Sequence, residues 1–369
     1  MSLSIDGAWT IDGAWSVNDG SGGGPTPPSN DFTTPALING DTQTLRMFDI
    51  VVSSSGRFVT VGVDNSGSSR YPMYATSTDG QTWTTPARMA NAFGYGMNAV
   101  AVNSSGLFVA VGTNQLGGGS YATSSNGTTW TIGDFPGGGS GALSGEMRGV
   151  TWSQSLGLFV AVGMNNNSAP LFSTSSDGST WTTPALMNGY NSYASLISVA
   201  ASPNGPIVAI GVNASVVGLY STSTDGSTWT TPALINGVTA QNQINGITVN
   251  SSGLFVAVGN DAYGHSVYAT SSDGSTWTSP AVMSIFDTGS FMQSVAVNSS
   301  GTFVAVGHNG SNYPMFATSS DGSTWTTPAL MNGSTSITQM YAVAGNSSGL
   351  FVAIGQDFTP TSYYANGIF

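Results

Sequence analysis

The chain alternates short apolar runs with polar, glycine-containing turns, and this pattern recurs seven times. Residues 99–106 read AVAVNSSG, a period-two alternation that predicts a half-buried strand ending in a Ser-Ser-Gly turn. An apolar run, LFVAVG, follows at 107–112 and ends at glycine. Segments such as 121–125 (YATSS) predict a third strand, and segments such as 180–186 (TWTTPAL) predict a fourth. The proline of the fourth segment suits an outer edge strand, where a missing N–H disturbs no ladder.

The spacing of the repeat indicates how the strands assemble. The tryptophan of the DGSTW-like segment recurs at intervals of 47, 51, 48, 48 and 48 residues, and each interval fits one four-stranded propeller blade. No segment shows a helical period. We therefore predict an all-β protein, a seven-bladed β-propeller of four-stranded antiparallel blades. The FVAVG-like runs begin at Phe58, Phe108, Phe159, Ile207, Phe255, Phe303 and Phe351.

The two ends of the repeat region complement each other. The last copy ends near Tyr364, after a third-strand segment, whereas residues 32–40 (FTTPALING) copy a fourth-strand segment with Phe32 in the tryptophan position. Phe32 precedes Phe58 by 26 residues, the same separation that follows Trp181 and the three later tryptophans. We predict that this N-terminal strand is the outer strand of the last blade, so that antiparallel pairing closes the ring and removes a free edge.

Residues 1–29 precede the repeat. They contain a small tandem, IDGAWTIDGAW, followed by NDGSGGGPTPPS, whose composition is that of a flexible and partly extended linker. We expect 1–29 to be a tag and linker and 30–369 to be the propeller. Two interpretations of the tag stay open, an anchor to a partner and a disordered leader. The first residues have neither a basic region nor an apolar region, so no secretory signal is expected there.

The segment SSDGSTW resembles the Asp-box (BNR) motif, S-x-D-x-G-x-T-W, of sialidase-like and other seven-bladed propellers, with one residue fewer between aspartate and glycine. The resemblance extends over about residues 30–369 and implies the propeller fold. In the motif the aspartate can lock its own turn, and the tryptophan can fill the gap between blades. A ring of aspartate metal sites is the alternative, but the motif spaces no further ligands around each carboxylate. The matching positions are Asp79, Asp177, Asp225, Asp273 and Asp321, with Asn126 replacing aspartate in the second blade, and Trp83, Trp130, Trp181, Trp229, Trp277 and Trp325.

The copies differ from one another mainly in two of the four connections of each blade. The turns NSSG and SDGST are nearly constant, and both are expected on one face of the disc. The variable connections, rich in Tyr, Phe, Asn, Gln, Ser and Gly, are expected on the opposite face. Loops on a rigid frame commonly carry recognition, so we predict a binding surface there; neutral drift is the alternative. Candidate ligand-binding residues are Arg46, Asp49, Arg70, Tyr71, Tyr95, Glu146, Arg148, Tyr190, Tyr193, Tyr263, His265, Phe286, His308 and Tyr313.

The innermost strands are expected to line a central channel with small residues, which let seven strands converge on a narrow axis. Asp49 is the only charged residue of this set. We expect Asp49 to pair with Arg46 or Arg148; a bound water or cation is the alternative. The seven expected channel residues are Asp49, Ala99, Gly149, Ser198, Gly246, Ser294 and Ala342.

Charge is scarce in this chain. Charged residues make up 6% of the sequence, against roughly 25% in typical soluble domains. The five basic residues are all arginine, and the net charge is −12. Nucleic-acid binding needs clustered cations, and an anionic membrane would repel the chain; no apolar run approaches the roughly 20 residues that span a bilayer. We therefore expect neither nucleic-acid partners nor membrane insertion.

The sequence offers little chemistry for a cofactor or a metal. It contains no cysteine, so disulfides and thiolate metal sites are excluded. His265 and His308 fall in adjacent loops, but the only further ligand evident near them is Asp261. We expect no cofactor and no metal site.

These features favour recognition or assembly outside a cell. We predict a non-enzymatic virion or cell-surface structural protein, such as a phage tail, fibre or capsid-exterior component, that binds host glycan or partner proteins through its variable face. A purely structural scaffold is one alternative. A sialidase-like glycoside hydrolase, which the resemblance brings in, is the other. Glu146, the only glutamate, lies beside Arg148, but the family's F/Y-R-I-P motif does not precede the first blade. A catalytic pair of Glu146 with Asp49 or Asp134 would depend on geometry.

Overall fold

The structure is a computed structural model. The predicted tag and linker, residues 1–29, lie outside the residues that it describes, and so does Phe286. The described ranges are 30–39, 45–65, 70–90, 93–137, 144–190, 193–236, 242–283, 289–336, 338–359 and 361–369.

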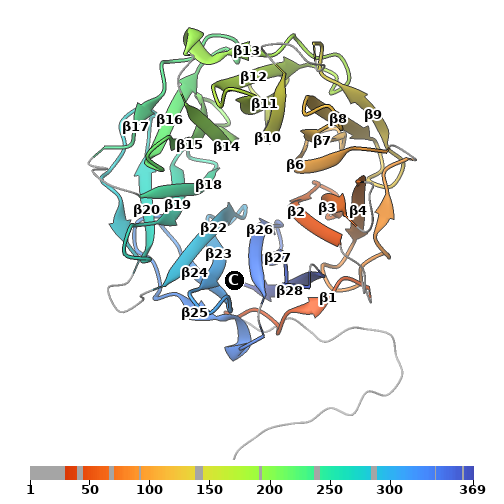
Figure 1. The fold of residues 1–369 in the computed structure, drawn as a ribbon. Helices are drawn as coiled ribbons and strands as arrows, with labels where there is room; N and C mark the ends of the chain where they lie inside the picture. The colour runs from red at the N-terminus through yellow and green to blue at the C-terminus, as the bar shows by residue number, and fades with distance from the viewer. Residues whose placement is uncertain are drawn as a thin grey trace, which may run out of the picture.

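Seven four-stranded antiparallel sheets surround a central axis as the blades of a propeller (Figure 1), which confirms the predicted fold class. In blades 1 to 6 the four strands follow chain order from the axis to the rim, as in β2-β3-β4-β5. The described residues contain no α-helix, only short 3-10 turns at Met187–Gly189 and Met331–Gly333.

The strands of each blade, named from the axis outward, have the following bounds. Blade 1 is β2 (Leu45–Val52), β3 (Phe58–Asp64), β4 (Tyr71–Ser77) and β5 (Ala87–Arg88); blade 2 is β6 (Gly96–Val102), β7 (Phe108–Thr113), β8 (Gly119–Ser124) and β9 (Thr131–Asp134); blade 3 is β10 (Gly145–Ser153), β11 (Leu158–Asn165), β12 (Pro170–Ser175) and β13 (Ala185–Leu186). Blade 4 is β14 (Ala194–Ala201), β15 (Ile207–Asn213), β16 (Gly218–Ser223) and β17 (Ala233–Leu234); blade 5 is β18 (Gln243–Val249), β19 (Phe255–Asn260), β20 (Ser266–Ser271) and β21 (Ala281–Val282); blade 6 is β22 (Ser290–Val297), β23 (Phe303–Asn309), β24 (Pro314–Ser319) and β25 (Ala329–Leu330). Blade 7 is β26 (Gln339–Gly345), β27 (Leu350–Gln356), β28 (Ser362–Ile368) and β1 (Ala36–Leu37).

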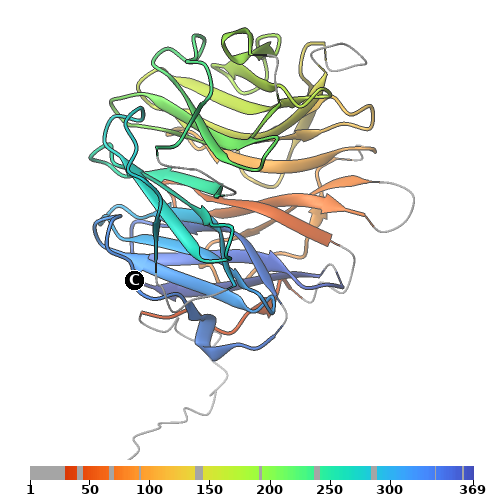
Figure 2. The same ribbon diagram turned by 60° about the vertical axis from the view of Figure 1, so that its left-hand side comes forward.

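Segments from both ends of the described chain share blade 7. Strand β1 pairs antiparallel with β28, with Ala36 opposite Tyr364 and Leu37 opposite Tyr363. An isolated bridge between Phe32 and Gly367 extends this contact, and the two segments lie side by side at the rim in Figures 1 and 2.

Most outer strands are shorter than the sequence predicts. Six of them pair over only two residues, directly after the proline, whereas β9 pairs over four. In blade 1 the hydroxyl of Thr84 accepts the N–H of Thr76 at 3.0 Å and the N–H of Thr84 donates to the carbonyl of Thr76 at 2.9 Å, so a side chain replaces a regular ladder bond. Blade 2 reads TWTIGD, without the proline, in the corresponding stretch, and its strand keeps the longer ladder.

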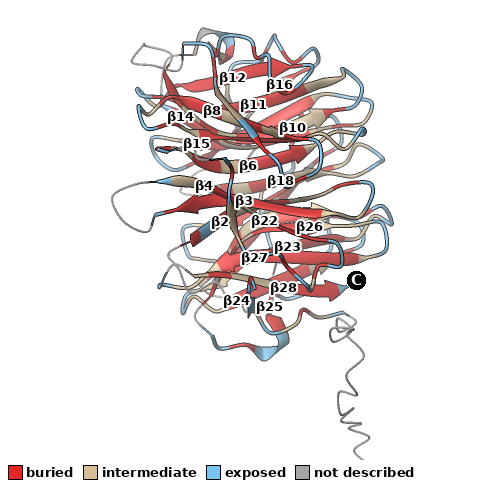
Figure 3. Ribbon diagram, turned by 90° about the vertical axis from the view of Figure 1, so that its right-hand side faces the viewer, coloured by how far each residue is buried: buried red, intermediate tan, exposed pale blue. Residues whose placement is uncertain are grey.

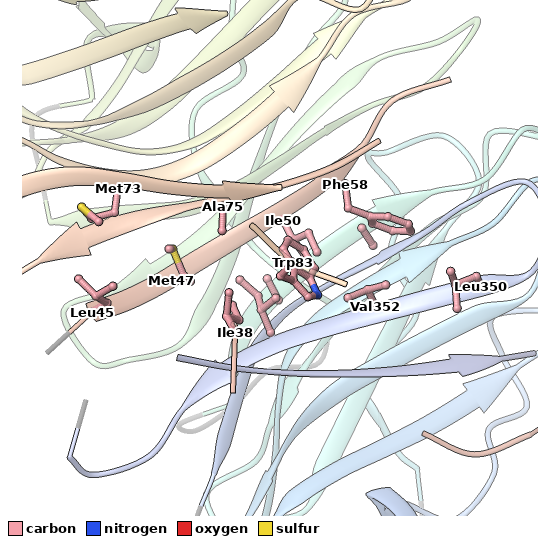
Figure 4. Close-up of a cluster of buried hydrophobic side chains, with 13 residues drawn as sticks. Ile38, Leu45, Met47, Ile50, Phe58, Met73, Ala75, Trp83, Leu350 and Val352 are labelled. Carbon is pink, nitrogen blue, oxygen red and sulfur yellow. The ribbon is translucent and has the colours of Figure 1, made fainter. Parts of the chain in front are cut away.

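Aromatic rings join each blade to the next. The ring before each outer strand packs against an aromatic residue on the third strand of the preceding blade, with centroids 5.4–6.2 Å apart. The buried positions run along the strands between the blades (Figure 3). Figure 4 shows the junction of blades 7 and 1, where Trp83, Ile38 and Val352 belong to one buried cluster. The seven pairs are Trp83–Tyr364, Trp130–Tyr74, Trp181–Tyr121, Trp229–Phe172, Trp277–Tyr220, Trp325–Tyr268 and Phe32–Phe316.

A β-bulge interrupts every inner strand at the same place, and the glycine of the FVAVG-like run lies opposite it. A Cβ atom on any of these glycines would lie 1.8–2.0 Å from a carbonyl oxygen two residues before the bulge. The repeat therefore needs glycine here because the bulged backbone occupies the space of a side chain. The bulge residues are Phe48, Asn98, Arg148, Ile197, Asn245, Gln293 and Tyr341.

The contact between glycine and bulge can be tested in blade 6. Gly307→Ala would place a methyl group 1.8 Å from the carbonyl oxygen of Phe291, so the bulge must open or the strands must separate. We expect a loss of about 1–3 kcal/mol in the free energy of unfolding, measured by urea denaturation. The matched control is Gly310→Ala, three residues further on, where the nearest heavy atom would be 3.5 Å away. Equal destabilisation by both substitutions would contradict this account of the motif.

Candidate functional site

The blade connections divide between two faces of the disc. The turn face carries the constant turns, and a hollow there combines Ser202 and Ser252, from neighbouring blades, with Ser272. The loop face carries the variable connections, where each segment entering a blade meets the loop of the blade before it; the N–H of Gly289, for example, donates to the carbonyl of Gly264 at 2.6 Å. The edge-on view in Figure 3 shows exposed connections on both sides of the buried strands.

The loops between the second and third strands share a fixed frame that sequence analysis missed. An Asn or Asp stands two residues after the glycine of the FVAVG-like run in every copy. In six blades its Oδ1 accepts the backbone N–H groups two and four residues later, a side-chain lock of the Asx type. The constant position of this residue in the repeat was the sequence signal that could have indicated the lock. The six residues are Asn114, Asn165, Asn213, Asp261, Asn309 and Asp357.

A large hollow on the loop face lies between blades 5 and 6. It has a volume of about 590 Å³, and its wall includes Asp261, Tyr263, Gly264 and Phe291. Tyr263 is 82% exposed at the tip of its loop. Its ring centroid lies 6.2 Å from that of His265. The site therefore combines an open aromatic surface with hydrogen-bonding groups.

The polar side of this groove is held in place by hydrogen bonds. Oδ2 of Asp261 and Nδ1 of His265 lie 2.8 Å apart, and Oδ1 accepts the backbone N–H groups of Tyr263 and His265. Burial opposes the charge of Asp261, but the hydrogen bonds from His265 and Tyr263 outweigh it and lower the pKa of the carboxyl group. Because Nδ1 is engaged, Nε2 of His265 is the ring nitrogen left for a ligand.

His308 has a different environment. Its ring stacks on Phe291 with centroids 5.2 Å apart, and its Nδ1 lies 3.0 Å from the carbonyl oxygen of Asn309. Burial lowers the pKa of His308 and outweighs the backbone hydrogen bond that raises it. The described ranges contain no cluster of three or more His, Cys, Asp or Glu residues suited to a metal.

The central channel has the lining that the sequence predicts, since all seven expected residues border it. The expected ion pair of Asp49 with arginine, however, is wrong for the described residues. Its carboxylate instead accepts the N–H groups of Ile50 and Val100, each at 2.8 Å. Burial raises the pKa of Asp49 to about 7, against the lowering effect of these two hydrogen bonds.

Arg148 lies at the loop-face end of the channel. It forms an ion pair with Glu146, and its Nη1 donates to the hydroxyl of Ser195 at 2.6 Å. Arg46 is the second residue of β2, the inner strand of blade 1, and is exposed. Asp134, the other carboxylate considered for a catalytic pair, ends the outer strand β9 and accepts a bond from Asn114 at 3.0 Å. Glu146 thus belongs to an inner strand and Asp134 to the rim of another blade.

The other candidates are dispersed around the loop face. Arg88 stacks on Tyr71, 3.5 Å from the ring centroid, and pairs with Asp64 at 3.2 Å; Arg70 is exposed beside them. The hydroxyl of Tyr95 donates to Asp134 at 3.3 Å. The remaining tyrosines belong to blades 3, 4 and 6: Tyr190 packs against a buried cluster, Tyr193 is exposed and Tyr313 is half-buried.

On the turn face, the repeated aspartates lock their own turns. In blade 6, Oδ1 of Asp321 accepts the N–H groups of Ser323 and Thr324 at 2.7 and 2.6 Å. These backbone bonds hold the pKa of Asp321 well below its ordinary value. Asn126 accepts the equivalent bonds in blade 2, at 2.9 and 2.8 Å, so the lock requires the side-chain oxygen and works without the charge.

Comparison with known proteins identifies the fold of the chain but assigns the chain to no family. No protein-family model matches the chain, and no curated protein matches it by sequence. The BP39L lectin from Burkholderia pseudomallei is similar in structure, with a TM-score of 0.64 and 14% identity over 93% of this chain and 97% of the lectin. The GH74 xyloglucanase from Xanthomonas campestris gives 0.57 at 14% identity, over 87% of this chain and 52% of that enzyme. The NanB sialidase from Streptococcus pneumoniae gives 0.52 at 14% identity, over 93% and 71%.

These similarities establish a shared propeller architecture, found in lectins and in glycoside hydrolases alike. Within the described ranges, no helix has the length and the apolar character needed to cross a membrane.

The aspartate turns predict how stability depends on pH. Because the folded state holds the pKa of Asp321 below its ordinary value, its charge contributes stability above about pH 4 that is lost as the pH falls further. Asp321→Asn keeps the side-chain oxygen and removes the charge. We expect the variant to be slightly less stable at pH 7, and its thermal midpoint to fall less steeply than that of the wild type between pH 4 and pH 2. Parallel curves would contradict this role.

Proposed function

We propose that this protein is a non-enzymatic glycan-binding component of a virion or cell surface. The single observation that carries the proposal is the groove between blades 5 and 6, where exposed Tyr263 lies beside the engaged Asp261–His265 pair. Sugars present an apolar face that stacks on aromatic rings and hydroxyl groups that exchange hydrogen bonds. A rigid loop supports this contact at low entropic cost, since the Asx lock already fixes its backbone.

The wider surface supports a hydrogen-bonding ligand. Exposed Phe93, Leu116, Tyr193 and Phe358 also belong to loop-face connections, so apolar contacts extend around the disc. Charged residues are 6% of the chain, and little of its recognition can depend on ion pairs. The similarity to BP39L, a lectin, and to a xyloglucanase and a sialidase in fold agrees with a carbohydrate ligand.

The location we propose is a phage tail, a tail fibre or a capsid exterior, with residues 1–29 as the anchor. The support is compositional: lysine and cysteine are absent, the blades are near-identical, and a Gly/Pro/Ser-rich linker joins the tag to the ring. Such a chain can display its loop face outward to a host glycan while its tag holds a partner protein. A ring whose faces contact only sister proteins is the competing structural role.

The groove predicts which residue dominates binding. On an array of neutral and sialylated glycans, we expect the wild type to retain specific glycans and Tyr263→Ala to lose affinity for them at least about tenfold, or about 1.4 kcal/mol. Tyr263→Phe should retain most of the affinity, because the stacking surface remains.

Leu116→Ala is the matched control, since Leu116 follows the locking Asn114 by two residues as Tyr263 follows Asp261, and it is 68% exposed. No retention of any glycan would support the scaffold role. Turnover of sialosides that is lost in Glu146→Gln would support the hydrolase instead.

A further inference from the structure

The centre of the disc contains a polar cavity that the glycan site does not use. It lies on the propeller axis, has a volume of about 140 Å³ and is bordered by all seven inner strands. This space is large enough for several water molecules. The β-bulges direct two consecutive residues of each inner strand to its wall, for example Phe48 with Asp49 and Asn98 with Ala99.

Among the residues that the structure describes, Asp49 is the only carboxylate that borders this cavity. Its two oxygens accept the N–H groups of Ile50 and Val100, and each keeps a further lone pair. No cationic side chain forms an ion pair with it among the described residues. Arg148 also borders the cavity, but its guanidinium group is engaged by Glu146 and Ser195. A half-buried charge without a counter-charge is costly.

The amides around Asp49 supply further oxygen atoms. Nδ2 of Asn98 donates to the carbonyl of Met147, and Nδ2 of Asn245 donates to that of Met292, both at 2.8 Å. Each bond uses the nitrogen end of the amide, and within the described structure the Oδ1 atoms have no protein partner. Gln293 borders the same cavity, and its amide likewise has no partner in the described ranges.

A carboxylate and three amides, with room for water beside them, provide an all-oxygen set, which is the ligand chemistry of hard cations such as Ca²⁺. We propose that the axial cavity is a cation site in which Asp49 provides the charge and Asn98, Asn245 and Gln293 provide neutral oxygens, directly or through water. A single carboxylate gives a weak site, with an expected dissociation constant of about 10⁻⁴–10⁻³ M. The cation would join the inner strands of blades 1, 2, 5 and 6 across the axis.

Terbium luminescence tests the site on the full chain. Tyr341 borders the cavity, so ultraviolet excitation of the protein should sensitise a Tb³⁺ ion bound beside it. We expect saturable emission that Ca²⁺ displaces, and a rise in the thermal midpoint when Ca²⁺ is added. Asp49→Asn should weaken binding at least about tenfold and abolish the thermal shift.

Two further variants separate the axial site from the surface. Gln293→Leu, which removes an oxygen without breaking a hydrogen bond of the described structure, should weaken Tb³⁺ binding severalfold, and it keeps the test decisive if Asp49→Asn does not fold. Asp321→Asn, on the turn face, should leave binding unchanged. Absence of saturable emission, unchanged binding in the Asp49 and Gln293 variants, or loss of binding in Asp321→Asn would each overturn the proposal. None of these outcomes bears on glycan binding, which is measured separately.

Discussion

The aromatic contact between neighbouring blades is the interaction on which the structure depends. Each blade places one ring against the preceding blade, and such a pair is worth about 0.5–1.5 kcal/mol beyond its buried area. Six of these rings are tryptophans, and Phe32 occupies the seventh position against Phe316. Each blade packs against two neighbours, so the ring is closed only when all seven contacts between blades are made. The pairing of β1 with β28 therefore belongs to the same constraint as the aromatic packing.

A second constraint links the frame to the axis. The glycine of each FVAVG-like run admits a bulge in the inner strand, and the bulge directs two consecutive residues to the channel wall. The repeat thus preserves the geometry of the axis while the residues at the bulge differ between blades. Because the residues at the bulge can differ between blades, the charged residues Asp49 and Arg148 can lie close to the axis of an otherwise nearly uncharged protein.

The loop face likewise combines a constant backbone geometry with variable residues. An Asn or Asp at a constant position locks the loop in six blades, so the residues between the locked points can change without loosening the loop. Tyr263 in blade 5 and Leu116 in blade 2 occupy corresponding positions and offer different chemistry. A repeat that keeps its frame and varies its tips can present distinct chemistry at one blade, which is what a recognition surface requires.

The sequence by itself determined the class of fold, the number of blades, the channel-lining positions and the division into constant and variable connections. These follow from local periodicity and from a long repeat whose copies can be counted along the sequence. It did not determine the short outer strands, where Thr84 bonds the backbone in place of a regular ladder, or the hydrogen bonds of Asp49 in place of an arginine pair. It also could not bring Asp261, Tyr263 and Phe291 to one groove. Those outcomes depend on distances between residues of different strands and blades, and only the packed ring fixes those distances.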